Sequence, residues 1–291
     1  MMLIEDIDLF LKVALKITVL TFLAAIGIWG YNPLESHSEP AFDTAVADST
    51  EFVLPKGSDS LVIAFESDSI PKISPRDQLA DQDKIFGIRI SENHGNLIDD
   101  VNASDGVAFI LSKATSGTYV DRFFSQNWRI AQEKDFFRGA CHTYIDERNP
   151  KEQAELFCRV VGRLAEDDIP PVLEFISIAP TSDITTFQHD VLDWLMITER
   201  ETGKRPIIMA EYEFAKAYLN NPLLGQYALW ISDVTDDSKP NIPMLWQDSG
   251  WTFWHSLDDP DFHGVSVGHI EFMGSMQDLE FFINDSYKKS N

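Results

Sequence analysis

From Lys84 onward the chain alternates between short apolar runs and amphipathic stretches. The apolar runs are "KIFGIRI" (84–90), "GVAFILSK" (106–113), "GACHTY" (139–144), "PPVLEFI" (170–176), "RPIIMAE" (205–211), "YALWIS" (227–232), "PMLWQD" (243–248) and "GVSVGHIEF" (264–272). Runs of this length, bounded by Gly, Pro and Asp, are typical of strands that are buried on both faces. The pattern therefore predicts eight strands.

Helical patterns lie between the earlier strands, at residues 122–134, 150–166, 182–202 and 213–220, and Gly203 ends the third as a C-cap glycine. Strands that alternate with helices predict a parallel sheet, and eight of them favour a closed β/α barrel. The last three strands are joined by segments without a helical pattern. The predicted fold class is therefore α/β, an irregular TIM-like barrel with few helices in its last third, whose chemistry lies at the C-terminal strand ends.

The N-terminus carries an apolar run over residues 9–31, interrupted only by Lys12 and Lys16. Such a run is long enough to cross a hydrocarbon core of ~30 Å if the two lysines extend toward the head groups. Lysines before the apolar core and acids after it place the N-terminus inside and the rest outside, on the periplasmic or extracellular side. The alternative is a cleaved signal peptide. The small-x-small site at 45–47 lies far beyond the apolar run, which favours a single-pass anchor in the cell membrane.

Residues 32–84 differ in amino-acid composition from the rest of the chain. They carry many acids, few bases and much Ser and Pro, with one strand-like run at 61–65. This composition is typical of a solvated linker. The predicted domains are thus a membrane anchor or signal peptide at 1–31, an acidic linker at 32–84 and a barrel domain at 85–291.

The formal net charge of −24 argues against binding nucleic acid through its phosphates and favours a basic protein partner. Only two cysteines occur, Cys141 on a predicted strand and Cys158 on the helix that follows. Outside the membrane a disulfide between them is chemically allowed, and two free thiols are the alternative. No Cys/His spacing typical of a metal site is present, so neither a metal nor a cofactor is predicted.

Eight blocks in order resemble the glycoside hydrolase family 25 lysozymes. They are "GIRISENHGN" (87–96), "LSKATSGTYVD" (111–121), "GACHTY" (139–144), "PPVLEF" (170–175), "RETGKRPIIM" (200–209), "LWIS" (229–232), "WTFWH" (251–255) and "FMGSMQDL" (272–279). The resemblance covers residues 85–285. It implies an irregular β/α barrel and an activity on the glycan strands of peptidoglycan.

The chain departs from this family where the chemistry is expected. Glycoside hydrolysis requires two placed carboxyl groups, one to protonate the leaving oxygen and one to act as base or nucleophile. The family has aspartate, an apolar residue and a proton-donating glutamate on the fourth strand; here the two acid positions hold Glu174 and Ile176. Arg89 replaces an aspartate of the first strand, and Gly268 and Ile270 replace an aspartate and an asparagine of the last.

Glu174 is therefore the only motif carboxylate that remains, and we expect Arg89 to pair with it and hold it ionised. The resemblance then implies a lysozyme-like protein whose catalysis is lost or strongly impaired. The alternative is an active muramidase in which Glu92, Glu211 or Glu271 supplies the missing acid.

The resemblance also implies a strip of substrate contacts at the barrel mouth, which is the end of the barrel where the parallel strands have their C-terminal ends. The residues expected there are His142, Tyr144, Trp246, Trp251 and Trp254, although a barrel-lining histidine is more often structural. Three functions follow: a tethered protein that binds peptidoglycan glycan, an active muramidase with relocated carboxylates, and an acidic module that holds a basic envelope protein.

Overall fold

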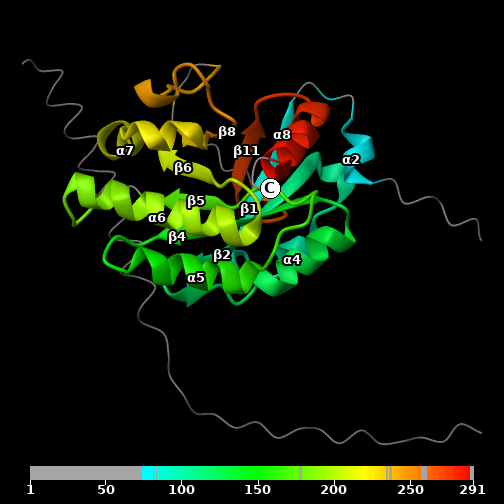
Figure 1. The fold of residues 1–291 in the computed structure, drawn as a ribbon. Coiled ribbons are helices and arrows are strands. Elements are labelled where there is room, and N and C mark those ends of the chain that lie inside the picture. Colours follow the sequence, from blue (N-terminus) through cyan, green and yellow to red (C-terminus); the bar gives the residue numbers. More distant parts are fainter. Residues whose placement is uncertain are drawn as a thin grey trace, which may run out of the picture. The chain divides into compact units, whose positions relative to one another are not determined.

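The computed structural model describes residues 74–80, 82, 84–176, 179–233, 235, 238–256 and 261–288, all within one compact unit that spans residues 66–291. Its centre is an eight-stranded barrel (Figure 1). The barrel strands are β1 (Ile85–Ile90), β2 (Val107–Ser116), β4 (Phe137–Tyr144), β5 (Val172–Phe175), β6 (Ile207–Glu211), β7 (Ala228–Ser232), β8 (Phe253–His255) and β11 (Gly268–Phe272). Their order is β1-β11-β8-β7-β6-β5-β4-β2, and pairing of β1 with β2 closes the ring. The predicted barrel is confirmed.

The barrel is mixed rather than fully parallel. β11 runs antiparallel to both of its neighbours, β1 and β8, whereas the other barrel pairs are parallel. Between β8 and β11 the described residues form a small hairpin of β9 (Asp261–Phe262) and β10 (Val265–Ser266). Parallel strands need a long crossover connection, usually a helix, so a return without one produces an antiparallel strand. A third short strand, β3 (Tyr119–Val120), pairs antiparallel with the end of β2.

The prediction of a strand at residues 243–248 is wrong. This segment contains a 3₁₀ turn, η4 (Met244–Trp246), and the seventh barrel strand is β8. Pro243 precedes the turn and its carbonyl accepts the Trp246 backbone N–H at 2.9 Å. The indole Nε1 of Trp246 donates to the Tyr227 carbonyl at 2.9 Å in the buried interior. The apolar character of this segment therefore reflects packing outside the barrel wall.

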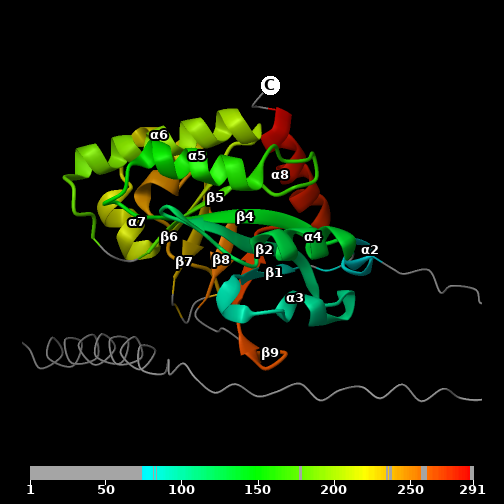
Figure 2. The same ribbon diagram turned by 90° about the horizontal axis from the view of Figure 1, so that it is seen from below.

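The expected helices are present with shorter bounds: α4 (Phe124–Glu133), α5 (Pro150–Val161), α6 (Ile184–Thr202) and α7 (Tyr212–Tyr218). Asn149 and Asp183 cap the N-termini of α5 and α6 through their side chains, as these residue types commonly do. Gly203 ends α6 with φ 80°, which confirms the predicted C-cap. Figure 2 shows α5 and α6 lying side by side over one face of the barrel.

The remaining elements are short, apart from the C-terminal helix. They are α2 (Pro75–Gln78), α3 (Leu97–Asp100), α8 (Met276–Lys288) and the 3₁₀ turns η1 (Glu92–His94), η2 (Ala103–Asp105) and η3 (Pro222–Gln226). α2 falls within the segment expected to be linker, and Arg76 on it donates to the carbonyls of Asp135 and Phe136. The ordered domain therefore begins before residue 85.

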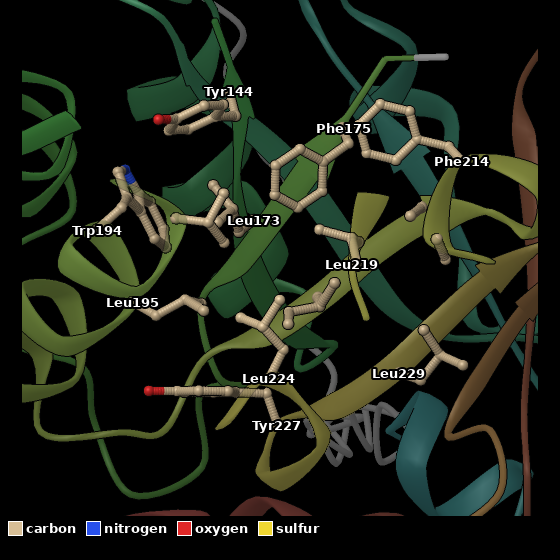
Figure 3. Packing of buried hydrophobic residues seen from close by; sticks show 14 of the residues in the cluster. Tyr144, Leu173, Phe175, Trp194, Leu195, Phe214, Leu219, Leu224, Tyr227 and Leu229 are labelled. Carbon is tan, nitrogen blue, oxygen red and sulfur yellow. The ribbon is translucent and has the colours of Figure 1, made fainter. Parts of the chain in front are cut away.

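Alternate residues of the strands build three hydrophobic clusters, of which the two largest lie on opposite faces of the barrel wall. One set, which includes Phe109, Leu111, Cys141, Val172 and Trp230, fills the barrel interior with contributions from α8. The other set, which includes Leu173 and Phe175, packs against α5, α6 and α7 (Figure 3). Because neighbouring residues of a strand point to opposite faces, position along each strand decides which core a side chain joins.

The interior is tightly filled near the first strand. A Cβ atom on Gly87 would lie 2.1 Å from the ring of the fully buried Phe109, so this position requires glycine.

None of the helices in the described ranges is both long and apolar enough to cross a membrane. The anchor expected at residues 9–31 and most of the linker expected at 32–84 lie outside these ranges.

Candidate active site at the barrel mouth

Glu174 lies at the C-terminal end of β5, on the side that faces the barrel interior. It is buried, with 7 % of its surface exposed. Its Oε1 lies 2.8 Å from Nη1 of Arg89. Its Oε2 accepts a hydrogen bond from the Thr143 hydroxyl at 2.8 Å and lies 3.9 Å from Nζ of Lys113. The expected pairing of Arg89 with Glu174 is confirmed.

This environment sets the protonation state of Glu174. Burial alone would raise the pKa of its carboxyl, but Arg89, Lys113 and the Thr143 hydroxyl together hold that pKa below its usual value. At neutral pH the group is therefore a carboxylate. It can stabilise positive charge or act as a nucleophile, but it has no proton to donate.

The two other positions of the lost acids carry no titratable group. Ile176 directly follows β5 and is 43 % exposed, so its hydrocarbon side chain faces solvent. Gly268 stands opposite Arg89 in the β1–β11 ladder. A Cβ atom at Gly268 would lie 3.6 Å from Nε2 of His255 and 3.7 Å from Cβ of Arg89, which is ordinary van der Waals contact, so a small side chain would fit at this position.

Glu271, one of the three alternative acids, is wrongly placed to replace the missing proton donor. It stands opposite Phe86 near the start of β1, toward the end of the barrel away from the mouth. Its Oε2 lies 3.1 Å from Nζ of Lys84. It also alternates with the interior residues Ile270 and Phe272, so it points out of the barrel.

Glu92 follows β1 and is engaged in a local cluster. Its Oε2 accepts hydrogen bonds from the Tyr119 hydroxyl at 2.7 Å and from Nε of Arg122 at 3.0 Å. These bonds lower the pKa of the Glu92 carboxyl, so it is ionised at neutral pH. Glu211, exposed at the end of β6, is the alternative that remains.

The structure corrects the expectation that His142, Tyr144 and Trp246 contact substrate. Their exposed fractions are 0, 3 and 0 %. His142 and Tyr144 alternate with Cys141 and Thr143 and therefore point away from the barrel interior. Figure 3 shows Tyr144 packed in the helix-side core beside Phe175. These side chains support the wall of the barrel from outside.

His142 illustrates this structural role. Its Nδ1 lies 2.6 Å from the Thr115 hydroxyl and its Nε2 lies 3.2 Å from Oε1 of Gln153. Its ring stacks on Trp194 at 5.2 Å between centroids. Burial lowers the pKa of His142 to about 4, so the imidazole is neutral at physiological pH.

Trp251 remains a predicted contact of the mouth, whereas the expectation for Trp254 is corrected, because Trp254 alternates with the interior residue Phe253 and packs in the same cluster as Tyr144. Trp254 is 8 % exposed and donates from Nε1 to the Asp233 carbonyl at 3.2 Å. Trp251 is half-buried and meets Trp254 edge to face, with ring centroids 6.1 Å apart. Trp251 thus presents part of its ring to solvent on a fixed support.

Sequence reasoning missed Thr143 as a partner of the site. Thr143 pairs with Glu174 in the β4–β5 ladder and shares its inward orientation. The signal was available, because two residues that align on neighbouring strands point to the same side of the sheet.

Cys141 and Cys158 are free thiols in the structure and are not joined by the disulfide that the sequence would allow. Burial raises the pKa of Cys141 to about 12 and that of Cys158 to about 11, which makes both thiols unreactive at neutral pH. Across the described ranges, no group of three or more His, Cys, Asp or Glu side chains is arranged to hold a metal ion.

The chain is similar to known proteins in its family profile, in its sequence and in its fold. The sequence profile of glycosyl hydrolases family 25 matches residues 88–265. The uncharacterized protein YegX of Escherichia coli (strain K12) is 29% identical over 179 residues, which are 60% of this chain and 63% of YegX. The chain therefore spans less than two thirds of the length of this relative.

Among solved structures, the bacterial lysozyme from Streptomyces coelicolor is similar with a TM-score of 0.62 at 24% identity, over 71% of this chain and 100% of that one. A family 25 glycosyl hydrolase from Bacillus anthracis is similar with a TM-score of 0.59 at 22% identity, over 69% and 94%. At these identities the likeness shows a shared fold. Because the family profile matches more than half of its length, this chain belongs to glycosyl hydrolase family 25.

Proposed function

We propose that this chain is a muramidase-like protein of the cell wall that binds the glycan strands of peptidoglycan, with its hydrolytic step lost or strongly impaired. The observation that carries the proposal is the 2.8 Å contact between Arg89 and Glu174. It occupies the one motif carboxylate that the chain retains and keeps it ionised.

The chemistry of glycoside hydrolysis supports this reading. Protonation of the leaving oxygen needs an acid, and the position directly after β5 where the family has its proton-donating glutamate holds Ile176, which has no proton to give. Loss of a general acid costs roughly 10²–10⁴ in rate. Arg89 adds a second penalty, because a fixed cation opposes the positive charge that develops on the sugar ring.

The test is release of reducing ends from purified peptidoglycan by the full-length protein. We expect a rate at least roughly 100-fold below that of an active family 25 lysozyme, for the reason just given. Glu174→Gln should leave this low rate unchanged, and Ile176→Glu provides the matched gain of an acid at the same strand end.

Measurable hydrolysis that disappears in Glu174→Gln would contradict the proposal. In parallel, sedimentation with insoluble cell wall should retain the unmodified protein. A protein that neither hydrolyses peptidoglycan nor sediments with cell wall would instead indicate an acidic module that holds a basic envelope protein. The net charge of −24 favours such a partner.

A second candidate function is an active muramidase in which Glu211 donates the proton. Glu211 is exposed and ends β6, the neighbour of β5, on the side of the strand that continues the interior positions Ile207 and Met209. In the same assay, hydrolysis that Glu211→Gln abolishes would establish this function. Equal rates with and without Glu211→Gln would exclude it.

We also propose that residues 9–31 tether the protein in the cell membrane with the barrel outside, as a single-pass protein. The support is the uncharged apolar core of this segment with lysines on its N-terminal side. Protease added to spheroplasts should digest the barrel domain while cytoplasmic proteins stay intact. Complete protection of the domain would refute the topology, and release of a shortened soluble protein would indicate cleavage as a signal peptide.

A further inference from the structure

A cavity of about 240 Å³ opens at the base of the barrel, the end opposite the mouth. It lies between α8 and the points where β6, β7 and β8 begin: Pro206 precedes β6, Ala228 begins β7, and Phe282 belongs to α8. Leu229 and Thr252 also line it. The cavity is smaller than the roughly 300–1,000 Å³ typical of sites for drug-sized ligands, so it suits a single large side chain.

Two large apolar side chains are exposed to solvent beside this cavity. Met273 is 56 % exposed, and a Cβ atom on Gly250, which lines the cavity, would lie 4.0 Å from Sδ of Met273. Phe281 is 71 % exposed and lies one helical turn before Asp285, another lining residue. Exposed side chains of this kind are common singly, but a group of them around a cavity is typical of an interaction surface.

A second pair of exposed apolar side chains lies on the turns that precede β7 and β8. Gly225 of η3 lines the cavity, and a Cβ atom there would lie 3.0 Å from Cδ1 of Leu245 in η4, so the two turns are in contact. On these turns Leu223 and Met244 are 59 and 90 % exposed. Four of the nine large apolar side chains that are exposed in the described ranges therefore belong to the segments around this cavity.

The charge of this surface indicates what kind of partner it takes. Arg205 and Asp285 line the cavity, and Nε of Arg205 lies 3.2 Å from Oε1 of Glu199. Counted with the charged residues on and directly after α8 and after η4, the acids outnumber the bases: Glu199, Asp248, Asp278, Glu280 and Asp285 against Arg205, Lys288 and Lys289. The chain as a whole has a formal net charge of −24. Complementarity of charge therefore favours a basic partner.

We propose that the base of the barrel docks a basic protein, which inserts one large apolar side chain into the cavity and places lysine or arginine residues against the surrounding acids. A buried apolar anchor within a ring of polar contacts is the usual centre of a protein interface. The inference goes beyond the proposed binding of glycan, because it uses the opposite end of the barrel. A chain that binds at both ends links the cell wall to this partner.

The experiment is calorimetric titration of the full-length protein, held in phosphatidylcholine nanodiscs, with short peptides, and empty nanodiscs provide the blank. The first peptide is a capped pentapeptide with two lysines on each side of a phenylalanine. Its controls carry alanine in place of the phenylalanine, or glutamate in place of each lysine. We expect the first peptide to bind roughly tenfold or more tightly than either control, because only this peptide has both an apolar anchor and a complementary charge.

Three variants assign the effect to the base of the barrel. Met273→Ser removes an exposed apolar side chain beside the cavity and should weaken binding of the phenylalanine peptide roughly threefold or more. Met196→Ser is the matched control and should change nothing, because Met196 is 62 % exposed on α6 and does not line this cavity. Ser249→Trp places a large ring on a residue that lines the cavity and should abolish the preference for phenylalanine over alanine. Thermal melts of each variant check that the fold is intact.

Equal affinity for the phenylalanine peptide and either control peptide would overturn the inference, as would equal losses in Met273→Ser and Met196→Ser. A dimer in sedimentation velocity that Phe281→Ser dissociates would overturn it in favour of a second copy of this chain. Sedimentation with cell wall should be the same for Ser249→Trp and the unmodified protein. The cell-wall assay therefore tests the proposed function separately from this inference.

Discussion

Replacing Arg89 with methionine should lower the free energy of unfolding by about 3 kcal/mol at pH 7. The substitution leaves the buried Glu174 carboxylate without its 2.8 Å partner, and an unpaired buried charge costs about 3–5 kcal/mol. The low end applies because Lys113 and Thr143 still face the carboxylate. Urea unfolding monitored by circular dichroism provides the measurement.

The loss of stability in Arg89→Met should depend on pH, because it depends on the charge of Glu174. The pKa of Glu174 lies below the usual 4.5 in the folded protein, so the ion pair stabilises the fold above that pH and loses its effect as the pH falls through the folded value. The difference between the two proteins should therefore shrink below about pH 4.5. Arg122→Met is the matched control, because its pair with Glu92 is exposed and should contribute far less. Equal losses in both variants would show that burial of Glu174 does not matter.

Replacing Lys204 with methionine should also destabilise the protein by about 3 kcal/mol or more. Lys204 is fully buried, and its ammonium donates to the backbone carbonyls of Glu166, Asp168 and Ile283. Each buried acceptor that is left without a donor costs about 1–3 kcal/mol. The loss should appear in urea unfolding as a lower midpoint with an unchanged slope.

Lys134 supplies the matched control for this prediction. Its ammonium also donates to three carbonyls, those of Ile98, Asp99 and Val101, at 3.0, 2.6 and 2.8 Å. Lys134 is only half-buried, so water can replace it in Lys134→Met. A loss in Lys134→Met as large as that in Lys204→Met would contradict the role assigned to burial.

The fold was largely predictable because its signals are local. Continuous apolar runs, the caps of the helices and Gly203 all lie within a few residues of the elements that they define. α8 carried such a signal as well: Ser275 and Asp278 form reciprocal hydrogen bonds before its apolar residues, as in a capping box. The antiparallel direction of β11 was not predictable in this way, because it depends on how a distant part of the chain closes the ring.

The site was predicted well for Glu174 and poorly for its aromatic neighbours. Arg89 and Glu174 could be paired because both end strands of one barrel and carry opposite charge. His142 and Tyr144 also end a strand, but they are one residue out of phase with the inward-facing Thr143. A shift of one residue turns a side chain to the other face, so the residue type alone does not identify a contact of the mouth.

The closing strand has a consequence for how the chain folds. β1 pairs with β11, for example Arg89 with Gly268, and these partners lie on the order of 180 residues apart in the sequence. During synthesis the edges of β1 and β8 lack this partner until nearly the entire domain has emerged. Unpaired strand edges promote association between chains, and pairing of distant segments is slow. We therefore expect ring closure to be a late step of folding, and incomplete chains that end before β11 to be the species most prone to aggregate.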